Sequence, residues 1–222
     1  MFVLIALILL PLAAIGVQLA FDLGTALGMA GYSFYKIFFI VPPLIYCRAV
    51  GVSIFDDVLK LKNWRQHLPT AGLLGGLAIL IFWGAYYFLG DKLLIDKETI
   101  VGKIRDQFGV TSKTIFFIAA ITIFANSLLE EFFYRGFAFG LLVRKQRRLG
   151  YLLPATVFTI QHSLFIYHWV AFLPLVLALA ALFVLALVLQ KLYEQADSIA
   201  APWLTHACGD IAMMGIAVTM LW

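Results

Sequence analysis

Apolar residues dominate the chain in long runs, and most charged residues lie between those runs. The apolar runs cover residues 2–21, 25–47, 71–89, 115–142, 151–166, 169–190 and 200–221. A helix needs about 20 apolar residues to cross the ~30 Å hydrocarbon core of a bilayer. The pattern therefore predicts an all-α polytopic bundle of about seven transmembrane helices, with six or eight as the neighbouring counts.

One polar connection shows a helical pattern of its own. Residues 91–109 carry apolar side chains at Leu93, Leu94, Ile100, Val101, Ile104 and Phe108. Such spacing predicts an amphipathic helix that lies on the membrane surface. A solvated connector with a few apolar anchors fits the same residues.

The composition agrees with a membrane protein. The chain is 64% hydrophobic and 13% charged, whereas soluble domains have roughly 45–50% apolar and about 25% charged residues. The spans and their loops use the whole length, so we expect a single integral membrane domain over residues 1–222. The basic residues lie mainly in the loops, so the net charge of +4 indicates topology and no nucleic-acid partner.

The loop charges predict the orientation. Loops 48–70, 143–150 and 191–199 together carry nine Lys and Arg residues, whereas segment 90–114 carries five that are mixed with four acidic residues. Basic residues next to spans favour the cytoplasmic side. We therefore place the N-terminus and the run "RKQRR" in the cytoplasm and the C-terminus on the opposite side.

A few ionisable residues lie inside the apolar runs, where each charge costs roughly 2.5–3.5 kcal/mol unless it finds a partner. They are Lys36, Glu130, Glu131, Arg135, His162, His206 and Asp210. The long side chain of Lys36 can snorkel toward water, so we expect a structural role for it. Cys47 and Cys208 are 161 positions apart in apolar segments and are expected to be packing residues, not a disulfide.

The acidic pair divides into two different cases. Glu131 and Arg135 are four residues apart with the acid first, the favourable order for an ion pair on a helix. Glu130 lies ~100° further round the helix, on a stripe with Asn126 and Tyr134, and has no cation nearby in sequence. It must find a partner on another helix or remain protonated.

The depths of three candidate residues agree. Counted from the predicted cytoplasmic ends of their spans, Glu130, His162 and His206 lie at ~18, ~16 and ~9 Å by the α-helical rise. His162 follows Phe158 by four positions and Asp210 follows His206 by four, so each pair shares one helix face. We therefore predict a single cavity between mid-membrane and the cytoplasmic surface.

These residue types allow two kinds of hydrolytic chemistry. A buried Glu130 could take a proton from water and pass it to a leaving amine, while imidazole groups hold the oxyanion of a peptide carbonyl. The same groups could hold a divalent metal such as zinc, with Glu130, His162, His206 and Asp210 as ligands. The sequence contains no GxSxG, HExxH or glycine-rich phosphate loop.

Three short motifs carry a resemblance. "EEFFYR" at 130–135 fits EExxxR, "FTIQH" at 158–162 fits FxxxH, and "HACGD" at 206–210 fits Hxxx(N/D). In this order on separate apolar segments, they resemble the CPBP (Abi) family, which includes the type II CAAX prenyl endopeptidases and bacteriocin-processing or immunity proteins. The resemblance covers a catalytic core of about residues 115–215.

The resemblance implies a role for each motif residue. Glu130 becomes the base that activates water, and Glu131 with Arg135 becomes its supporting pair. His162 and His206 line the site as groups that orient the water and bind the oxyanion. The implied function is an intramembrane endopeptidase that cuts a membrane-anchored peptide or protein in the bilayer, of a prenylated CAAX type or with a leader, near the cytoplasmic leaflet.

Asp210 departs from the commoner pattern, because many relatives have Asn there. A carboxylate at this position could orient His206 or add metal-binding character. We expect no cofactor, since the sequence offers no extra Cys or His ligand. A metal-dependent protease with the same residues and a non-catalytic immunity or membrane accessory protein are the alternatives.

Overall fold

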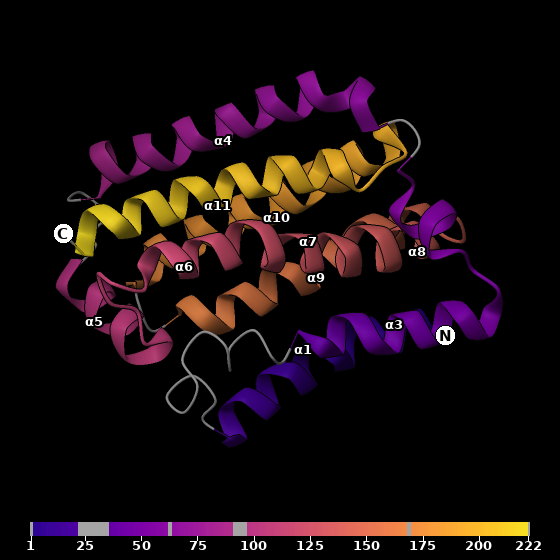
Figure 1. Ribbon diagram of the computed structural model, residues 1–222, viewed down its shortest axis with the longest axis horizontal. Coiled ribbons are helices and arrows are strands. Elements are labelled where there is room, and N and C mark those ends of the chain that lie inside the picture. Colours follow the sequence, from indigo (N-terminus) through magenta and orange to yellow (C-terminus); the bar gives the residue numbers. More distant parts are fainter. Residues whose placement is uncertain (1, 22–35, 62–63, 91–96, 168–169, 222) are drawn as a thin grey trace.

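The computed structural model describes residues 2–21, 36–61, 64–90, 97–167 and 170–221, and within these ranges all regular structure is helical, with no strand. The principal helices are α1 (Phe2–Phe21), α3 (Ile37–Val50), α4 (Leu68–Leu89), α5 (Lys97–Phe108), α9 (Arg147–Ile166), α10 (Phe172–Ala196) and α11 (Ala200–Leu221). Apart from α5, they run roughly along one axis as a bundle, with the two chain termini at opposite ends (Figure 1). The predicted all-α fold is confirmed.

The central helix covers residues 115–142 and contains two π-helical segments. Its parts are α6 (Ile115–Ala120), η3 (Ile121–Asn126), α7 (Ser127–Glu131), η4 (Phe132–Phe139) and α8 (Gly140–Leu142). The π segments η3 and η4 flank the short α7 turn that carries Glu130 and Glu131. Single π-helical turns inside longer helices occur frequently at functional sites. All eight residues of η4 are buried, so this helix forms the core of the bundle.

The predicted count of seven spans is approximate. Within the described part of the chain, four segments are long and apolar enough to cross a bilayer, namely Ile54–Phe88, Ile115–Leu142, Phe172–Ala196 and Ala200–Leu221. Shorter apolar helices cover Phe2–Ala14 and Ile37–Val50. Residues 25–35 of the second predicted span lie outside the described residues. The fifth predicted span, 151–166, forms most of α9 but is shorter than the ~30 Å core requires.

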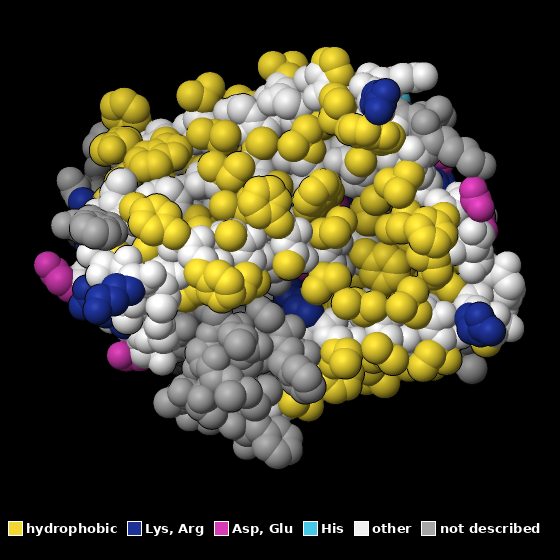
Figure 2. All heavy atoms as spheres, in the orientation of Figure 1, with side chains coloured by type: hydrophobic (Ala, Val, Ile, Leu, Met, Phe, Trp, Pro, Cys, Tyr) yellow, Lys and Arg dark blue, Asp and Glu magenta, His cyan; other side chains and the backbone are white. Residues whose placement is uncertain are grey.

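The surface view fits a bilayer environment. Large apolar side chains cover much of the face shown in Figure 2, while charged ones gather mainly toward its two ends. The side chains of Leu73, Phe88 and Phe172 are more than 70% exposed. An exposed apolar surface of this extent is unfavourable in water and favourable against lipid, so the chain is an integral membrane protein.

The predicted amphipathic segment forms a helix in its second half. α5 lies across the end of the bundle at which α11 ends (Figure 1). Its residue Ile104 packs on a small apolar cluster that includes Ile115 and Ala217, whereas Lys103 and Arg105 are exposed. Residues 91–96 of the predicted range lie outside the described residues.

The opposite end of the bundle joins the three basic loops. Arg144 forms an ion pair with Asp57 at 3.3 Å, and Lys60 forms another with Asp197. The Ile199 N–H donates to the Leu59 carbonyl at 2.9 Å. The loops that the sequence predicts on one side of the membrane therefore meet at one end.

A loop closes over the central helix at this end because a glycine allows it. The π-helical segment η1 (Ile54–Leu59) rests on Gly136, where an added Cβ would lie 2.8 Å from Val58 Cγ1 and 3.0 Å from its carbonyl oxygen. The Tyr193 hydroxyl donates to the same Val58 carbonyl at 2.7 Å. A side chain at position 136, directly after Arg135, would push this loop away from the site helix.

Candidate functional site

Glu130 is buried on the α7 turn, and its two carboxylate oxygens have different surroundings. Oε1 forms an ion pair with the ammonium group of Lys36 and accepts a hydrogen bond from Asn126 Nδ2 at 3.3 Å. Oε2 has no hydrogen-bond partner among the described residues. The carboxylate without a cation nearby in sequence thus finds one on another helix. The expected snorkelling of Lys36 is wrong, because Lys36 is only 2% exposed.

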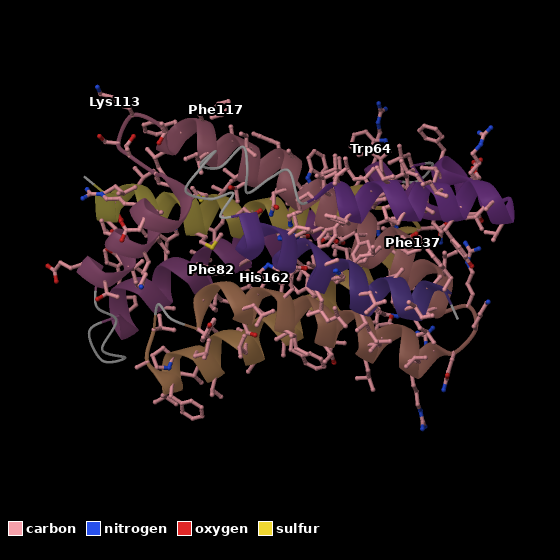
Figure 3. All side chains as sticks on the ribbon, turned by 90° about the horizontal axis from the view of Figure 1, so that it is seen from below. Trp64, Phe82, Lys113, Phe117, Phe137 and His162 are labelled. Carbon is pink, nitrogen blue, oxygen red and sulfur yellow. The ribbon has the colours of Figure 1, made fainter. Side chains whose placement is uncertain are left out.

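Both histidines approach the second oxygen of Glu130. His162 Nε2 lies 3.7 Å and His206 Nε2 lies 3.9 Å from Glu130 Oε2. The predicted convergence of three helices on one site is therefore confirmed. In Figure 3, His162 lies along the bundle between Lys113, which is near one end, and Trp64. Both distances are too long for a direct hydrogen bond, and polar groups at such separations are commonly bridged by water.

Each imidazole is oriented through its other nitrogen. His162 Nδ1 lies 2.8 Å from the Phe158 carbonyl oxygen, and His206 Nδ1 lies 2.7 Å from Glu131 Oε1. A carbonyl oxygen can only accept, so His162 Nδ1 carries a hydrogen, and the same holds for His206 Nδ1 when Glu131 is ionised. The two Nε2 atoms are then left to face Glu130, as acceptors in neutral rings or as donors in protonated ones.

The predicted contact between Glu131 and Arg135 is present, with Arg135 Nη1 donating to Glu131 Oε1 at 2.9 Å. The guanidinium also lies 4.4 Å from the ring centroid of Phe158. That ring in turn contacts His162 and His206, with centroid separations of 4.2 and 6.0 Å. Phe158 therefore packs between the cation and both imidazoles, which gives the first residue of the FxxxH motif a physical role.

Asp210 approaches the site without a close contact to its histidine. Its Oδ1 lies 3.9 Å from His206 Nε2, beyond hydrogen-bond distance. Its Oδ2 is buried without a hydrogen-bond partner in the described part of the chain. His206 is oriented by the hydrogen bond that it donates to Glu131, and Asp210 lies farther from the ring.

Comparison with known families bears on this cluster directly. Residues 112–212 match the family model described as "Type II CAAX prenyl endopeptidase Rce1-like". This segment therefore resembles the Rce1-like family. The similarity supports an intramembrane endopeptidase, a peptide-bond hydrolase. No curated protein and no solved structure matches the chain.

The Rce1-like segment contains all six predicted site residues, but the structure adds two partners that sequence reasoning missed. Lys36 lies outside the matched segment. The sequence feature that could have indicated its role is that it is a lone cation in the middle of an apolar run. Gln161, next to His162, is buried and accepts a hydrogen bond from the Tyr134 hydroxyl. The hydrogen bond of Gln161 links α9 to η4, and the sequence feature that could have indicated it is an uncharged polar residue inside an apolar helix.

The geometry does not favour a metal in the Rce1-like site. No group of three His, Cys, Asp or Glu side chains within the described ranges is arranged to hold a metal ion. The ammonium group of Lys36 also occupies Oε1 of Glu130, and a cation at that oxygen would repel a second one. The donor set therefore does not fit a metal, and the expectation of a cofactor-free enzyme remains a prediction.

Proposed function

We propose that the chain is a membrane endopeptidase in which Glu130 activates a water molecule for attack on a peptide bond. The supporting observation is the arrangement around Glu130 Oε2, which faces the Nε2 atoms of His162 and His206 at 3.7 and 3.9 Å. A water that bridges Oε2 and either nitrogen would lie within hydrogen-bond reach of both atoms. General-base catalysis requires such contact between the base and the proton that it removes.

The proposed reaction has two proton transfers. Glu130 Oε2 takes one proton from the water as its oxygen bonds to the peptide carbonyl carbon, and the carbonyl oxygen becomes an oxyanion. The intermediate then breaks its C–N bond, and the protonated Glu130 gives its proton to the departing amine. Glu130 returns to the carboxylate form, and the products are a carboxylic acid and an amine.

The two histidines take different parts in this proposal. The His162 Nδ1 hydrogen is held by a backbone carbonyl, so the Nε2 of its neutral ring can accept the second hydrogen of the water and orient it. His206 has carboxylate oxygens of Glu131, Glu130 and Asp210 within 4 Å of its ring nitrogens. That negative surrounding would stabilise an imidazolium, whose Nε2–H can donate to the oxyanion.

We propose a membrane-anchored substrate of the prenylated CAAX type, in keeping with the name of the matching family. The side chain of His162 is 26% exposed, compared with 3% for Glu130 and 7% for His206. The scissile bond would therefore reach Glu130 past His162. We place the end with the basic loops in the cytoplasm, so that the site opens toward that side.

The test is cleavage of an internally quenched, farnesylated CAAX peptide by the full-length protein in lipid nanodiscs. Glu130→Gln keeps the size of the side chain but removes the base, so the cleavage rate should fall by about 10²–10⁴-fold. His206→Ala should lower the rate by about 10²–10³-fold, the cost of losing one oxyanion-hole donor. His162→Ala should also lower the rate, because the water loses the acceptor that orients it. The control is Glu98→Gln, because Glu98 is exposed on α5 and distant from the site in the bundle.

The proposal fails if E130Q cleaves the peptide at the wild-type rate. It also fails if E98Q lowers the rate as much as E130Q does, because the loss would then not be specific to the site. Thermal unfolding of each variant, followed by tryptophan fluorescence, separates a lost base from a lost fold.

A further inference from the structure

The cation that completes the site comes from outside the Rce1-like segment. Lys36 directly precedes α3, 94 residues before Glu130 in sequence. Both side chains are 3% exposed. A buried ion pair is retained only when its geometry compensates for the loss of water from both charges, so the position of Lys36 requires an explanation.

Aromatic packing fixes where the Lys36 ammonium group lies. Its Nζ lies 5.0 Å from the ring centroid of Phe39, one turn along α3. The Phe39 ring stacks on Phe133 of η4 with a centroid distance of 4.5 Å and an interplanar angle of 12°. It also meets the ring of Tyr134 edge-on. Helix α3 is therefore locked to the same π-helical segment that follows Glu130.

The ion pair also separates the tasks of the two oxygens of Glu130. Oε1 is held by Lys36 and Asn126, which leaves Oε2 toward the two imidazoles. Without the cation at Oε1, a buried carboxyl group favours its neutral, protonated form, which cannot take a proton from water. Oε2 would also lose the contact that now holds it 3.7 and 3.9 Å from the two imidazole nitrogens.

We propose that Lys36 is a positioning residue that holds Glu130 ionised and keeps its Oε2 at water distance from His162 and His206. It acts through Glu130 and does not touch the substrate. The inference rests on the proposed function for its kinetic consequence, but the placement of the charge can be measured without a substrate.

The kinetic test compares Lys36→Met with Lys36→Arg in the farnesylated-peptide assay. K36M should lower kcat by about 10²-fold or more, the low end for loss of a general base, with KM nearly unchanged because the substrate contacts remain. K36R keeps a cation and should recover most of kcat. The matched control is Lys113→Met, since Lys113 is exposed near one end of the bundle and away from His162 (Figure 3).

The spectroscopic test uses infrared difference spectra of the same proteins without substrate. K36M should show a new C=O band of a protonated carboxyl group, and the double variant K36M/E130Q should lack it. The double variant should also unfold at a higher temperature than K36M, because it no longer buries an ionisable carboxyl group that has lost its cation. This comparison still works if K36M folds poorly.

The outcomes separate the two proposals. Wild-type kcat in K36M, or failure of K36R to recover activity, overturns the positioning role, and so does a K36M spectrum identical to that of the wild type. Undiminished cleavage by E130Q overturns the proposed function instead. In that case the infrared comparison still decides whether Lys36 holds Glu130 as an anion.

Discussion

Loss of the Arg135 guanidinium should destabilise the protein strongly. Arg135 is fully buried and pairs with Glu131 through one nitrogen at 2.9 Å. Arg135→Met fills much of the same volume, so the measured loss reports the charge and not a cavity. Removal of one partner of a buried pair costs about 3–5 kcal/mol because the other charge remains uncompensated.

Two features of the surroundings of Arg135 place the expected loss of stability at the lower end of this range. Glu131 keeps its hydrogen bond from His206 at 2.7 Å, which retains part of its compensation. In addition, Arg135 Nε and Nη2 are buried without hydrogen-bond partners among the described residues, so the substitution also removes two poorly satisfied donors. We expect a loss of about 3 kcal/mol, equivalent to about 10²-fold in the unfolding equilibrium.

The assay is equilibrium unfolding by SDS in mixed micelles, followed by tryptophan fluorescence. The matched control is Arg147→Met, because Arg147 also forms an ion pair, with Glu194, but its side chain is 62% exposed. Exposed pairs contribute little to stability, so R147M should unfold close to the wild type. The double variant E131Q/R135M should recover much of the loss. Equal stability of R135M and R147M would refute the reasoning.

Two further predictions concern the cofactor and the orientation. Treatment with a strong chelator should leave peptide cleavage unchanged, and elemental analysis should find no stoichiometric metal; loss of activity that added Zn²⁺ restores would contradict this. Single cysteines at Arg148 and Lys113, introduced after replacement of Cys47 and Cys208 by Ala, should react with an impermeant maleimide from opposite sides of the membrane. R148C should be labelled only from the cytoplasmic side and K113C only from the other side. The exchanged pattern would reverse the proposed topology, and labelling of both from one side would exclude it.

Sequence periodicity was sufficient to predict the all-helical fold and the contact between Glu131 and Arg135, because both depend on local spacing. The pair of Glu131 and Arg135 follows from their four-residue separation, and the approach of three helices follows from the depths of Glu130, His162 and His206. The two π-helical segments were not predictable in the same way. A π-helical turn contains one more residue than an α-helical turn, but it has no characteristic amino-acid composition. The run "FFYRGFAF" is equally compatible with an ordinary α-helix.

Long-range pairing was the other limit. Lys36 and Glu130 are 94 positions apart, and no spacing rule connects residues on different helices. The sequence showed that Glu130 had to find a partner or remain protonated, and that Lys36 was a lone cation in an apolar run, but it did not show that these two residues pair. The same limit applies to His206, whose orienting partner is Glu131 on the central helix and not Asp210 four residues away.

The positions of Lys36 and Arg135 along the chain, relative to the two glutamates that they neutralise, have a consequence for biogenesis. Synthesis runs from the N-terminus, so Lys36 has already been made when the central helix leaves the ribosome, and Arg135 follows Glu131 by only four residues. The carboxylates of Glu130 and Glu131 and the cations of Lys36 and Arg135 are therefore able to neutralise one another before α9 and α11 exist. The helix that carries the most buried charge can enter the bilayer as an electrically neutral unit, followed at once by the basic run that anchors its end. His162 and His206 are synthesised afterwards. The translocation machinery therefore inserts a neutral segment first, and the two histidines join the site last.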